Sequence, residues 1–427
     1  MSEATPGLKT GGVLVILAAM LAGGLLGAAA GSDGLIAGLD VIKLADFLGS
    51  LFINLLKMLI VPLVMASVIT GVASLGDSRH LGRLGGLSFA FYVLTTLIAV
   101  LIALVIVNLV QPGIVNGVPA RDLLALHADQ ASVDLAVRAK AQGDVFSLLL
   151  GMVPTNILQA AAEGKLIGVL LFSVLFGLFL ARVESPYREA VATFWQGLFR
   201  VMMRMTWFVM LLAPVGVFGL TARTVARTGL DAAGPLLTFG GCVLGGLLVY
   251  SLLALPMLMR ATGRMRPWAL IPALSPALLT AFSTASSSAT LPLTLQCTEE
   301  RAGVSPRIAG FVLPLGVSIN HAGSALYECA AALFIAQAYG LDLSVAQQVT
   351  IVFLALVTSM GIAGIPAASL VGITVILAAV GLPAEAIGVL LVLDRLLDMC
   401  RTAVNVLADS ACAVIVARLS GEKNVLA

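Results

Sequence analysis

Charged residues are scarce in this sequence. Asp, Glu, Lys and Arg make up 11% of its 427 residues, and the hydrophobic set AVILMFWYC makes up 60%. An average soluble domain is about 25% charged. A soluble globule can hide apolar side chains only in its interior, so this composition excludes a soluble enzyme, a nucleic-acid-binding protein and a disordered chain. We therefore expect a polytopic membrane protein whose apolar surface lies in the lipid bilayer.

Aromatic residues and cysteines are also few. Aromatics make up 6% of the chain, whereas there are 43 glycines, which favours helices packed closely through small residues. The five cysteines form no CxxC pair and lie in or beside apolar segments. We expect them to be small buried hydrophobic residues rather than disulfides or metal ligands. They are Cys242, Cys297, Cys329, Cys400 and Cys412.

Long apolar runs dominate the first 260 residues. A membrane-spanning helix needs about 20 apolar residues, and the runs predict spans near 11–31, 42–75, 84–111, 145–183, 190–222 and 233–260. The first run is interpreted as a retained span rather than a signal peptide. The second is too long for a perpendicular crossing, so it must tilt or extend beyond the membrane. The fourth contains Pro154 and Gly164, which predict a broken helix.

The remaining third of the chain is apolar but repeatedly interrupted. Its four segments are 268–298, 304–338, 346–382 and 383–418, and three of them are interrupted at 283–290, 318–324 and 361–366. Non-helical backbone at membrane depth is tolerated only inside protein or facing a cavity. Paired interrupted segments are therefore typical of a transporter binding site. The order predicts an internal repeat of hairpin and helix, twice.

The distribution of Lys and Arg predicts the orientation of the chain. If both termini are cytoplasmic, cytoplasmic segments carry about twice as many Lys and Arg as outer segments, in agreement with the positive-inside rule. We expect a multi-pass protein of a bacterial-type inner (plasma) membrane.

Polar residues in the last apolar segment share one helical face. At about 100° per residue they fall within a stripe about 100° wide. A charge at the bilayer centre costs about 2.5–3.5 kcal/mol, so such groups are expected to face a cavity and a partner. A buried ion-pair network between helices is the alternative, because Asp398 and Arg401 are spaced i,i+3. One arginine cannot satisfy all the others, which leaves capacity for a ligand and for cations. The stripe consists of Asp394, Asp398, Arg401, Thr402, Asn405 and Asp409.

Several motifs together resemble the dicarboxylate/amino-acid:cation symporter family, also called the glutamate transporter family. The resemblance covers nearly the whole chain. It rests on Lys57–Val64, Tyr92 with Thr95 and Thr96, Pro154–Asn156, Ala213–Phe218, Ser286–Pro292, Ala325–Glu328, Ala363–Pro366 and the last-segment stripe.

The resemblance implies an all-α fold with eight transmembrane helices and two re-entrant helical hairpins, assembled as a homotrimer. Residues 1–83 and 112–222 would form a scaffold. Residues 84–111 and 233–427 would form a transport domain that moves as an elevator. The implied activity is secondary active symport of aspartate or glutamate, driven by a sodium and/or proton gradient. The protein would then be no enzyme and would need no organic cofactor.

The resemblance also implies roles for individual residues. Asp398 would bind the substrate α-amino group and Arg401 its side-chain carboxylate. Hard oxygen ligands suit sodium, and half-helix carbonyls supply them without added charge. The other substrate-binding residues would be Ser286, Ser287, Ser324, Ile365, Thr402 and Asn405. A first sodium site would comprise Gly316, Asn320, Asn405 and Asp409, and a second Ser318, Ser359, Met360 and Ile362.

Two departures from the family pattern affect coupling. The family reads Asn-Met-Asp-Gly-Thr where this chain reads Asn320-His321-Ala322-Gly323-Ser324. The resemblance implies a third sodium site formed by Tyr92, Thr95, Thr96 and Asn320, which we expect to be weak or missing without a carboxylate at 322. Because histidine titrates near neutral pH, His321 is a candidate for proton coupling. The alternative is a neutral His321 bonded to a neighbour.

The second departure is a missing arginine. Family members carry one just before the serine run or directly after the aspartate that matches Asp398, where this chain has Ala285 and Met399. Arg395, one turn earlier, is the candidate substitute.

Two other functions remain open. A C4-dicarboxylate:cation symporter of the same family is one alternative, although a substrate without an amino group gives Asp398 no partner. An intramembrane hydrolase using Ser287 and His321, or an Asp pair, is the other. No GxSxG-type context surrounds the serines, which disfavours it.

Overall fold

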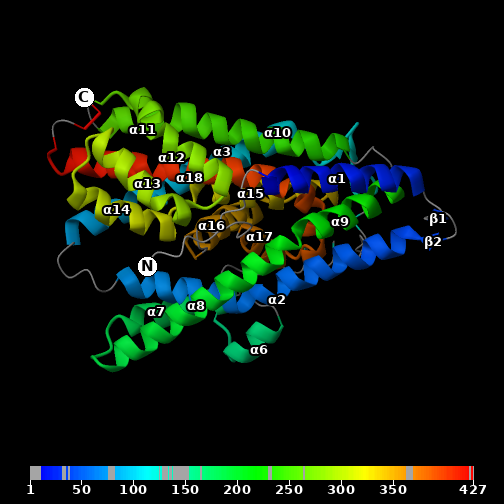
Figure 1. Ribbon diagram of the computed structural model, residues 1–427, viewed down its shortest axis with the longest axis horizontal. Helices are drawn as coiled ribbons and strands as arrows, with labels where there is room; N and C mark the ends of the chain where they lie inside the picture. The colour runs from blue at the N-terminus through cyan, green and yellow to red at the C-terminus, as the bar shows by residue number, and fades with distance from the viewer. Residues whose placement is uncertain are drawn as a thin grey trace.

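The computed structural model describes residues 11–30, 35–36, 39–75, 82–124, 126, 133, 137, 153–163, 166–228, 233–262, 265–361, 369–422 and 425–426. Within these ranges the chain is mostly helical, with two short antiparallel β-hairpins and connecting turns and loops (Figure 1). The first half contains α1 (Gly11–Ala30), β1 (Leu35–Ile36), β2 (Leu39–Asp40), α2 (Val41–Leu75), α3 (Gly82–Val110), β3 (Ile114–Val115), β4 (Val118–Pro119), α6 (Ile157–Ala162), α7 (Leu166–Leu180), α8 (Tyr187–Leu211) and α9 (Ala213–Thr228). The second half contains α10 (Ala233–Val249), a π-helical turn η1 (Tyr250–Ala254), α11 (Leu255–Thr262), a 3₁₀ turn η2 (Pro267–Ala269), α12 (Leu270–Thr284), α13 (Ser287–Glu300), α14 (Pro306–Ile319), α15 (Ala322–Ala338), α16 (Val345–Gly361), α17 (Ser369–Val380), a 3₁₀ turn η3 (Ala384–Ala386) and α18 (Ile387–Leu419).

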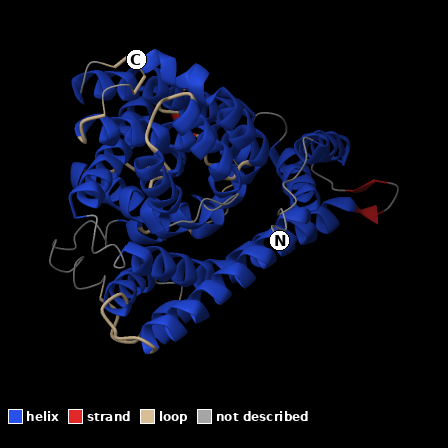
Figure 2. Ribbon diagram, turned by 60° about the vertical axis from the view of Figure 1, so that its left-hand side comes forward, coloured by secondary structure: helices blue, strands red, loops and turns tan. Residues whose placement is uncertain are grey.

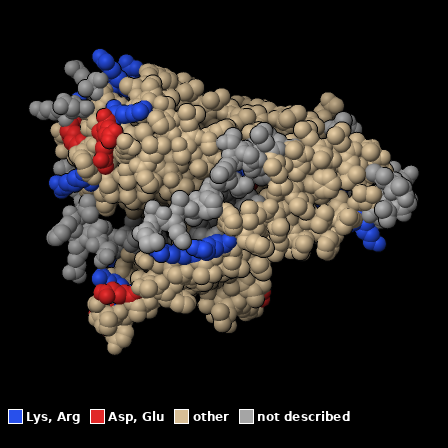
Figure 3. Space-filling view, viewed as in Figure 1, with Lys and Arg blue, Asp and Glu red and all other residues tan. Residues whose placement is uncertain are grey.

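Several of these helices have the length and composition of membrane spans. In the described ranges, four helical segments qualify: Leu84–Val110, Ala233–Thr262, Pro306–Ala338, which is interrupted at Asn320 and His321, and Ala384–Leu419. The pair α8 and α9 qualifies as a fifth if its 51° bend lies within one span. Large apolar side chains are exposed on these helices, for example Leu109 at 78% and Met257 at 70%. Figure 3 shows a largely uncharged face, with charged groups gathered mainly towards one end of the molecule. The chain is therefore an integral membrane protein with a mostly helical fold.

The predicted breaks in the apolar segments occur close to where the sequence places them. The fourth span is divided into α6 and α7 between Ala162 and Leu166. The helix α2 is continuous over 35 residues, which corresponds to about 52 Å at 1.5 Å per residue. That length exceeds a hydrocarbon core of about 30 Å, as the prediction of a tilted or extended helix requires. All five cysteines are free, and four of them are buried.

Two helical hairpins flank the interrupted helix of the second half. Hairpin 1 consists of α12 and α13, and its tip is a left-handed residue, Ala285 (φ 50°), followed by the helix-capping Ser286. Hairpin 2 consists of α16 and α17, and its connection, 362–368, lies outside the described residues. Between them, α14 and α15 are separated by Asn320 and His321. The described helices thus follow the predicted order of a helix pair, a broken helix, a second helix pair and a final helix. The re-entrant course of the two pairs in the membrane stays a prediction.

Helix contacts fall into two groups. The helices α1, α2, α7, α8 and α9 contact one another, and α3, α10 and α12–α18 form the other group around α15 and α18. Figure 2 shows the second group as a compact cluster beside the long helices of the first. Glycines allow close approach within the first group, since a Cβ atom on Gly23 would clash with the Phe218 backbone and one on Gly177 would lie 2.8 Å from Val72. The second group holds nearly all the buried polar side chains of the predicted site.

Candidate functional site

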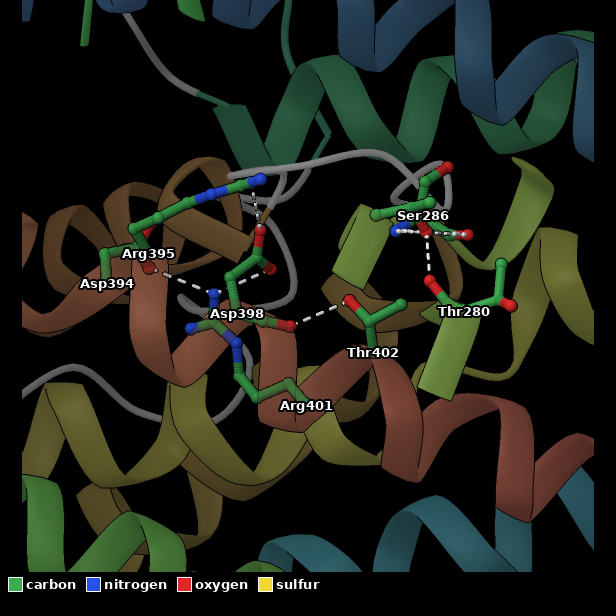
Figure 4. A network of polar contacts seen from close by, with 8 residues as sticks. Thr280, Ser286, Asp394, Arg395, Asp398, Arg401 and Thr402 are labelled. Atoms are coloured by element: carbon green, nitrogen blue, oxygen red, sulfur yellow. Dashed lines mark hydrogen bonds and ion pairs between the residues drawn. The ribbon is translucent and has the colours of Figure 1, made fainter. Parts of the chain in front are cut away.

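The polar stripe of α18 is buried inside the protein. All six of its members are at most 5% exposed. Figure 4 shows the side chains of Asp394, Asp398, Arg401 and Thr402 along α18. Ser286, at the tip of hairpin 1, is labelled to their upper right. The stripe predicted from helical periodicity therefore faces the interior and the hairpin tip rather than lipid.

Arg401 is the centre of this stripe. Its Nη2 donates hydrogen bonds to Oδ1 of Asp394 at 3.0 Å and to Oδ1 of Asp398 at 2.9 Å. Its guanidinium carbon lies 3.8 Å from the centroid of the Tyr327 ring, a cation–π geometry. Both hydrogens of Nη2 are used, whereas Nε and Nη1 have no hydrogen-bond partner among the described residues. The guanidinium is thus held in place and still has donors available for an anion.

A second buried arginine lies beside Asp398. The Arg395 side chain is 7% exposed, and its Nη1 is 3.9 Å from Oδ2 of Asp398. None of its three side-chain nitrogens makes a hydrogen bond within the described part of the chain. Two arginines therefore accompany Asp394 and Asp398, so the four groups together are formally neutral when all are ionised. This placement agrees with Arg395 as the substitute for the missing arginine, which stays a prediction.

The tip of hairpin 1 presents the start of a helix to α18. The Ser286 hydroxyl accepts a hydrogen bond from the backbone N–H of Ala289 at 3.3 Å, which caps α13. The next residue, Ser287, is buried. A helix N-terminus favours anions because its N–H groups and its dipole point outward. Ser286 and Ser287 therefore lie at a helix start that can attract an anion, and their binding of a substrate carboxylate stays a prediction.

The start of α15 is joined to α18 through Asn405. Its Oδ1 accepts a hydrogen bond from the backbone N–H of Gly323 at 2.8 Å, and its Nδ2 donates to Ser324 Oγ at 3.3 Å. One turn earlier, the Thr402 hydroxyl donates to the Asp398 carbonyl at 2.8 Å. Asn405 therefore joins Ser324 to α18, with Thr402 one turn earlier on the same stripe. Their role in substrate binding stays a prediction.

The candidate first sodium site is a group of polar residues around Asp409. Oδ1 of this residue accepts a hydrogen bond from Asn320 Nδ2 at 2.9 Å, whereas Oδ2 is buried without a partner among the described residues. A Cβ atom on Gly316 would lie 2.7 Å from Oδ1, so only glycine lets α14 come this close. An unsatisfied buried carboxylate oxygen is costly. The carboxylate lies beside Gly316 and the Asn320 side chain, and its unpartnered Oδ2 is suited to a small cation with oxygen ligands.

The hydroxyls of the predicted third sodium site gather around Asn320. Thr96 donates to its Oδ1 at 3.2 Å and Thr95 lies at 3.5 Å, while Tyr92 donates to the Val312 carbonyl at 2.6 Å. The hydroxyl groups are thus brought together but bonded within the protein. Ala322 adds no charge, in agreement with a weak or missing site.

The candidate second sodium site is only partly described. His321 Nδ1 lies 3.1 Å from the Ser359 carbonyl oxygen, and Met360 is half-buried nearby in sequence. Ser318 is exposed, and its hydroxyl donates to the Pro314 carbonyl. Ile362 and Ile365 lie outside the described residues.

One buried acid received no role from the sequence. Glu328 is fully buried on α15, and its Oε2 lies 2.6 Å from the Thr358 hydroxyl of α16, while Oε1 has no partner in the described ranges. The carboxyl group also lies directly against Gly372 of α17. The sequence does single out Glu328, because an acid inside an apolar segment is a functional candidate by default.

Comparison with known protein sequences identifies the family of this chain. The sequence pattern of the sodium:dicarboxylate symporter family matches residues 13–419. The chain is 37% identical to the proton/glutamate-aspartate symporter of Escherichia coli strain K12, over 88% of this chain and 86% of that protein. It is 35% identical to the proton/sodium-glutamate symport protein of Bacillus caldotenax, over 90% of each. It is also 32% identical to the C4-dicarboxylate transport protein of Bacillus subtilis strain 168, over 91% of each. This is a family of symporters and not of enzymes, so the hydrolase alternative is wrong. The chain belongs to the sodium:dicarboxylate symporter family.

Proposed function

We propose that this protein is a secondary active symporter that imports aspartate or glutamate using a sodium and/or proton gradient. The observation that carries the proposal is the buried Asp398–Arg401 pair, with donors of Arg401 left over. A buried cation beside a buried anion is complementary to an amino acid with a second carboxylate. The names of the relatives from Escherichia coli and Bacillus caldotenax support the same substrate class.

Substrate binding would use both ends of this pair. The substrate side-chain carboxylate would accept hydrogen bonds from Arg401, because a guanidinium–carboxylate pair is strong and directional. The α-amino group would bind Asp398, and the α-carboxylate would meet the N-terminus of α13 at Ser286 and Ser287. Thr402 and Asn405 would complete the site. Ile365 would close it from hairpin 2.

Cation coupling would depend on Asp409. Its open carboxylate oxygen, with the Gly316 and Asn320 carbonyls and the Asn405 side chain, would hold one sodium ion. The absence of a carboxylate at 322 supports fewer sodium ions per substrate than in relatives that have one there. No organic cofactor is needed for such a cycle.

Glu328 offers a route for a proton. Thr358 Oγ lies 2.6 Å from Glu328 Oε2 and 2.7 Å from the Leu354 carbonyl, but a hydroxyl has a single hydrogen. An ionised Glu328 accepts that hydrogen. A protonated Glu328 donates to Thr358, which then donates to Leu354. Both protonation states thus have a hydrogen-bonded arrangement, and we propose that Glu328 exchanges a proton during the cycle. Proton coupling through His321 stays a prediction.

Alternating access would come from movement between the two groups of helices. The group around α15 and α18 holds the site, and the group around α2 and α9 would be the scaffold. This division supports elevator movement. Assembly as a homotrimer with both termini cytoplasmic stays a prediction. Bacterial relatives support location in an inner membrane.

A C4-dicarboxylate:cation symporter is the second candidate. Asp398 disfavours a substrate without an amino group, because it would lose its ammonium partner. Arg395, however, lies 3.9 Å from Asp398 and supplies another cation. The Bacillus subtilis relative also carries a name of this class.

Uptake by purified protein in liposomes tests the proposal. Labelled aspartate, glutamate and succinate are supplied while sodium, proton and potassium gradients are imposed one at a time. We expect gradient-dependent accumulation of aspartate or glutamate. Accumulation of succinate alone would establish the second candidate, and accumulation of none under any gradient would refute both.

A further inference from the structure

The imidazole of His321 bridges two helix ends at membrane depth. His321 lies between the end of α14 and the start of α15 and is 3% exposed. It makes no side-chain capping bond to α15. Its Nδ1 instead lies 3.1 Å from the Ser359 carbonyl, 38 residues further along the chain in the last turn of α16. This contact therefore joins α16, the first helix of hairpin 2, to the junction between α14 and α15.

The donor and the acceptor of this hydrogen bond follow from the chemistry of the two groups. A carbonyl oxygen only accepts, so Nδ1 must carry the hydrogen, and in a neutral imidazole Nε2 then has a lone pair. Nε2 is buried and has no partner among the described residues. The ring thus needs no positive charge to make the contact.

The end of α16 is a place where a cation would otherwise bind. The last four carbonyls of a helix have no N–H partner within the helix, and the helix dipole makes them negative. The α14 carbonyls end at the same junction, since α14 stops at Ile319. Unwound backbone and half-helix C-termini of this kind coordinate sodium in transporters. An N–H group placed there satisfies the same oxygen without an ion.

We propose that neutral His321 takes the place of a cation at the C-terminal end of α16, so that α16 is held to the α14–α15 junction with sodium bound at Asp409 alone. The inference rests on the proposed symport function and deepens it, because it fixes the number of sodium ions that bind at this junction. Ala322 agrees with it, since the junction carries no carboxylate to attract another cation.

Three substitutions separate the hydrogen-bond donor from the shape of the ring. His321→Met keeps the bulk but removes the donor. His321→Asn places an amide nitrogen where Nδ1 stands and retains the donor. His321→Gln places its amide where Nε2 stands and is expected to miss Ser359.

The measurement is thermal unfolding of the purified full-length protein against sodium concentration, without organic substrate and with choline chloride keeping ionic strength constant. Ions that bind only the folded state raise the melting temperature by mass action. The dependence of the melting temperature on the logarithm of the sodium concentration therefore gives a Hill coefficient. We expect this coefficient to be about one for the wild type and His321→Asn. We expect a coefficient approaching about two for His321→Met and His321→Gln, because the vacated carbonyl then takes a second sodium ion.

Equal sodium dependence in all four proteins would overturn the proposal. So would a change shared by His321→Asn and the other two variants, because ring shape would then matter rather than the donor. If His321→Met does not fold, the sodium dependence of His321→Gln is compared with that of His321→Asn, and this comparison tests the hydrogen-bond donor in the same way. Aspartate and glutamate binding are measured separately on the wild type, and the absence of both would refute the proposed function while the sodium titrations still decide the role of His321.

Discussion

Replacing Arg401 by cysteine tests the site at its centre. The side chain is fully buried, its Nη2 bonds both Asp394 and Asp398, and the guanidinium lies over the Tyr327 ring. Removing one partner of a buried charge pair usually costs about 3–5 kcal/mol. Arg395 near Asp398 offsets part of that cost. We therefore expect Arg401→Cys to be less stable but folded.

The loss of substrate affinity follows from the remaining donors. A hydrogen bond to a charged group contributes about 1.5–3 kcal/mol, so two such bonds to a substrate carboxylate contribute about 3 kcal/mol or more. At 1.4 kcal/mol per tenfold change, aspartate and glutamate should bind at least about a hundredfold more weakly. Small neutral amino acids should be affected far less, because they have no carboxylate at that position. Arg401→Lys should not restore affinity, since a point charge cannot reproduce the planar donor geometry.

The assay is binding of aspartate, glutamate, serine and alanine to purified protein, with thermal stability measured in parallel. Arg223→Cys is the matched control, because Arg223 pairs with Asp46 in the α2–α9 group, away from the site. It should leave affinity unchanged. Undiminished aspartate affinity in Arg401→Cys would refute the assignment, and an equal loss for acidic and neutral substrates would show that Arg401 acts only on the fold.

Three other substitutions test separate parts of the cycle. Asp398→Asn should weaken aspartate binding by about tenfold or more while sparing succinate, because only the ammonium group loses its partner; competition binding measures this, and equal losses would make Asp398 structural. Asp409→Asn should raise the sodium concentration needed for half-maximal uptake by about tenfold or more, since the charged ligand is lost, and Asp46→Asn is its control. Glu328→Gln should abolish proton-driven accumulation while leaving exchange of internal for external substrate, and retained acidification of the liposome interior during uptake would contradict that role.

Much of this architecture follows from local sequence. Run length determined where α1, α2, α3 and α10–α11 lie, because a membrane span needs continuous apolar residues. Helical period placed Asp398 and Arg401 on one face, since i,i+3 and i,i+4 positions share a side. Clusters of Gly, Ser and Pro located the breaks in the later segments. The motifs determined the family, because they are specific in combination.

Only the tertiary structure decided how the buried polar groups are satisfied. Periodicity showed that Arg401 faces inward, but not that Nη2 alone serves both aspartates. The contacts of Asn320 with Thr96 and Asp409 cross 224 and 89 residues, and Glu328 meets Thr358 of hairpin 2. The sequence shows a histidine, His321, inside an apolar segment, but residue spacing does not predict its partner, Ser359. A hydrogen bond requires particular atoms within about 3 Å. Local sequence constrains which face of a helix is polar, whereas the packing of distant helices selects the atoms that meet.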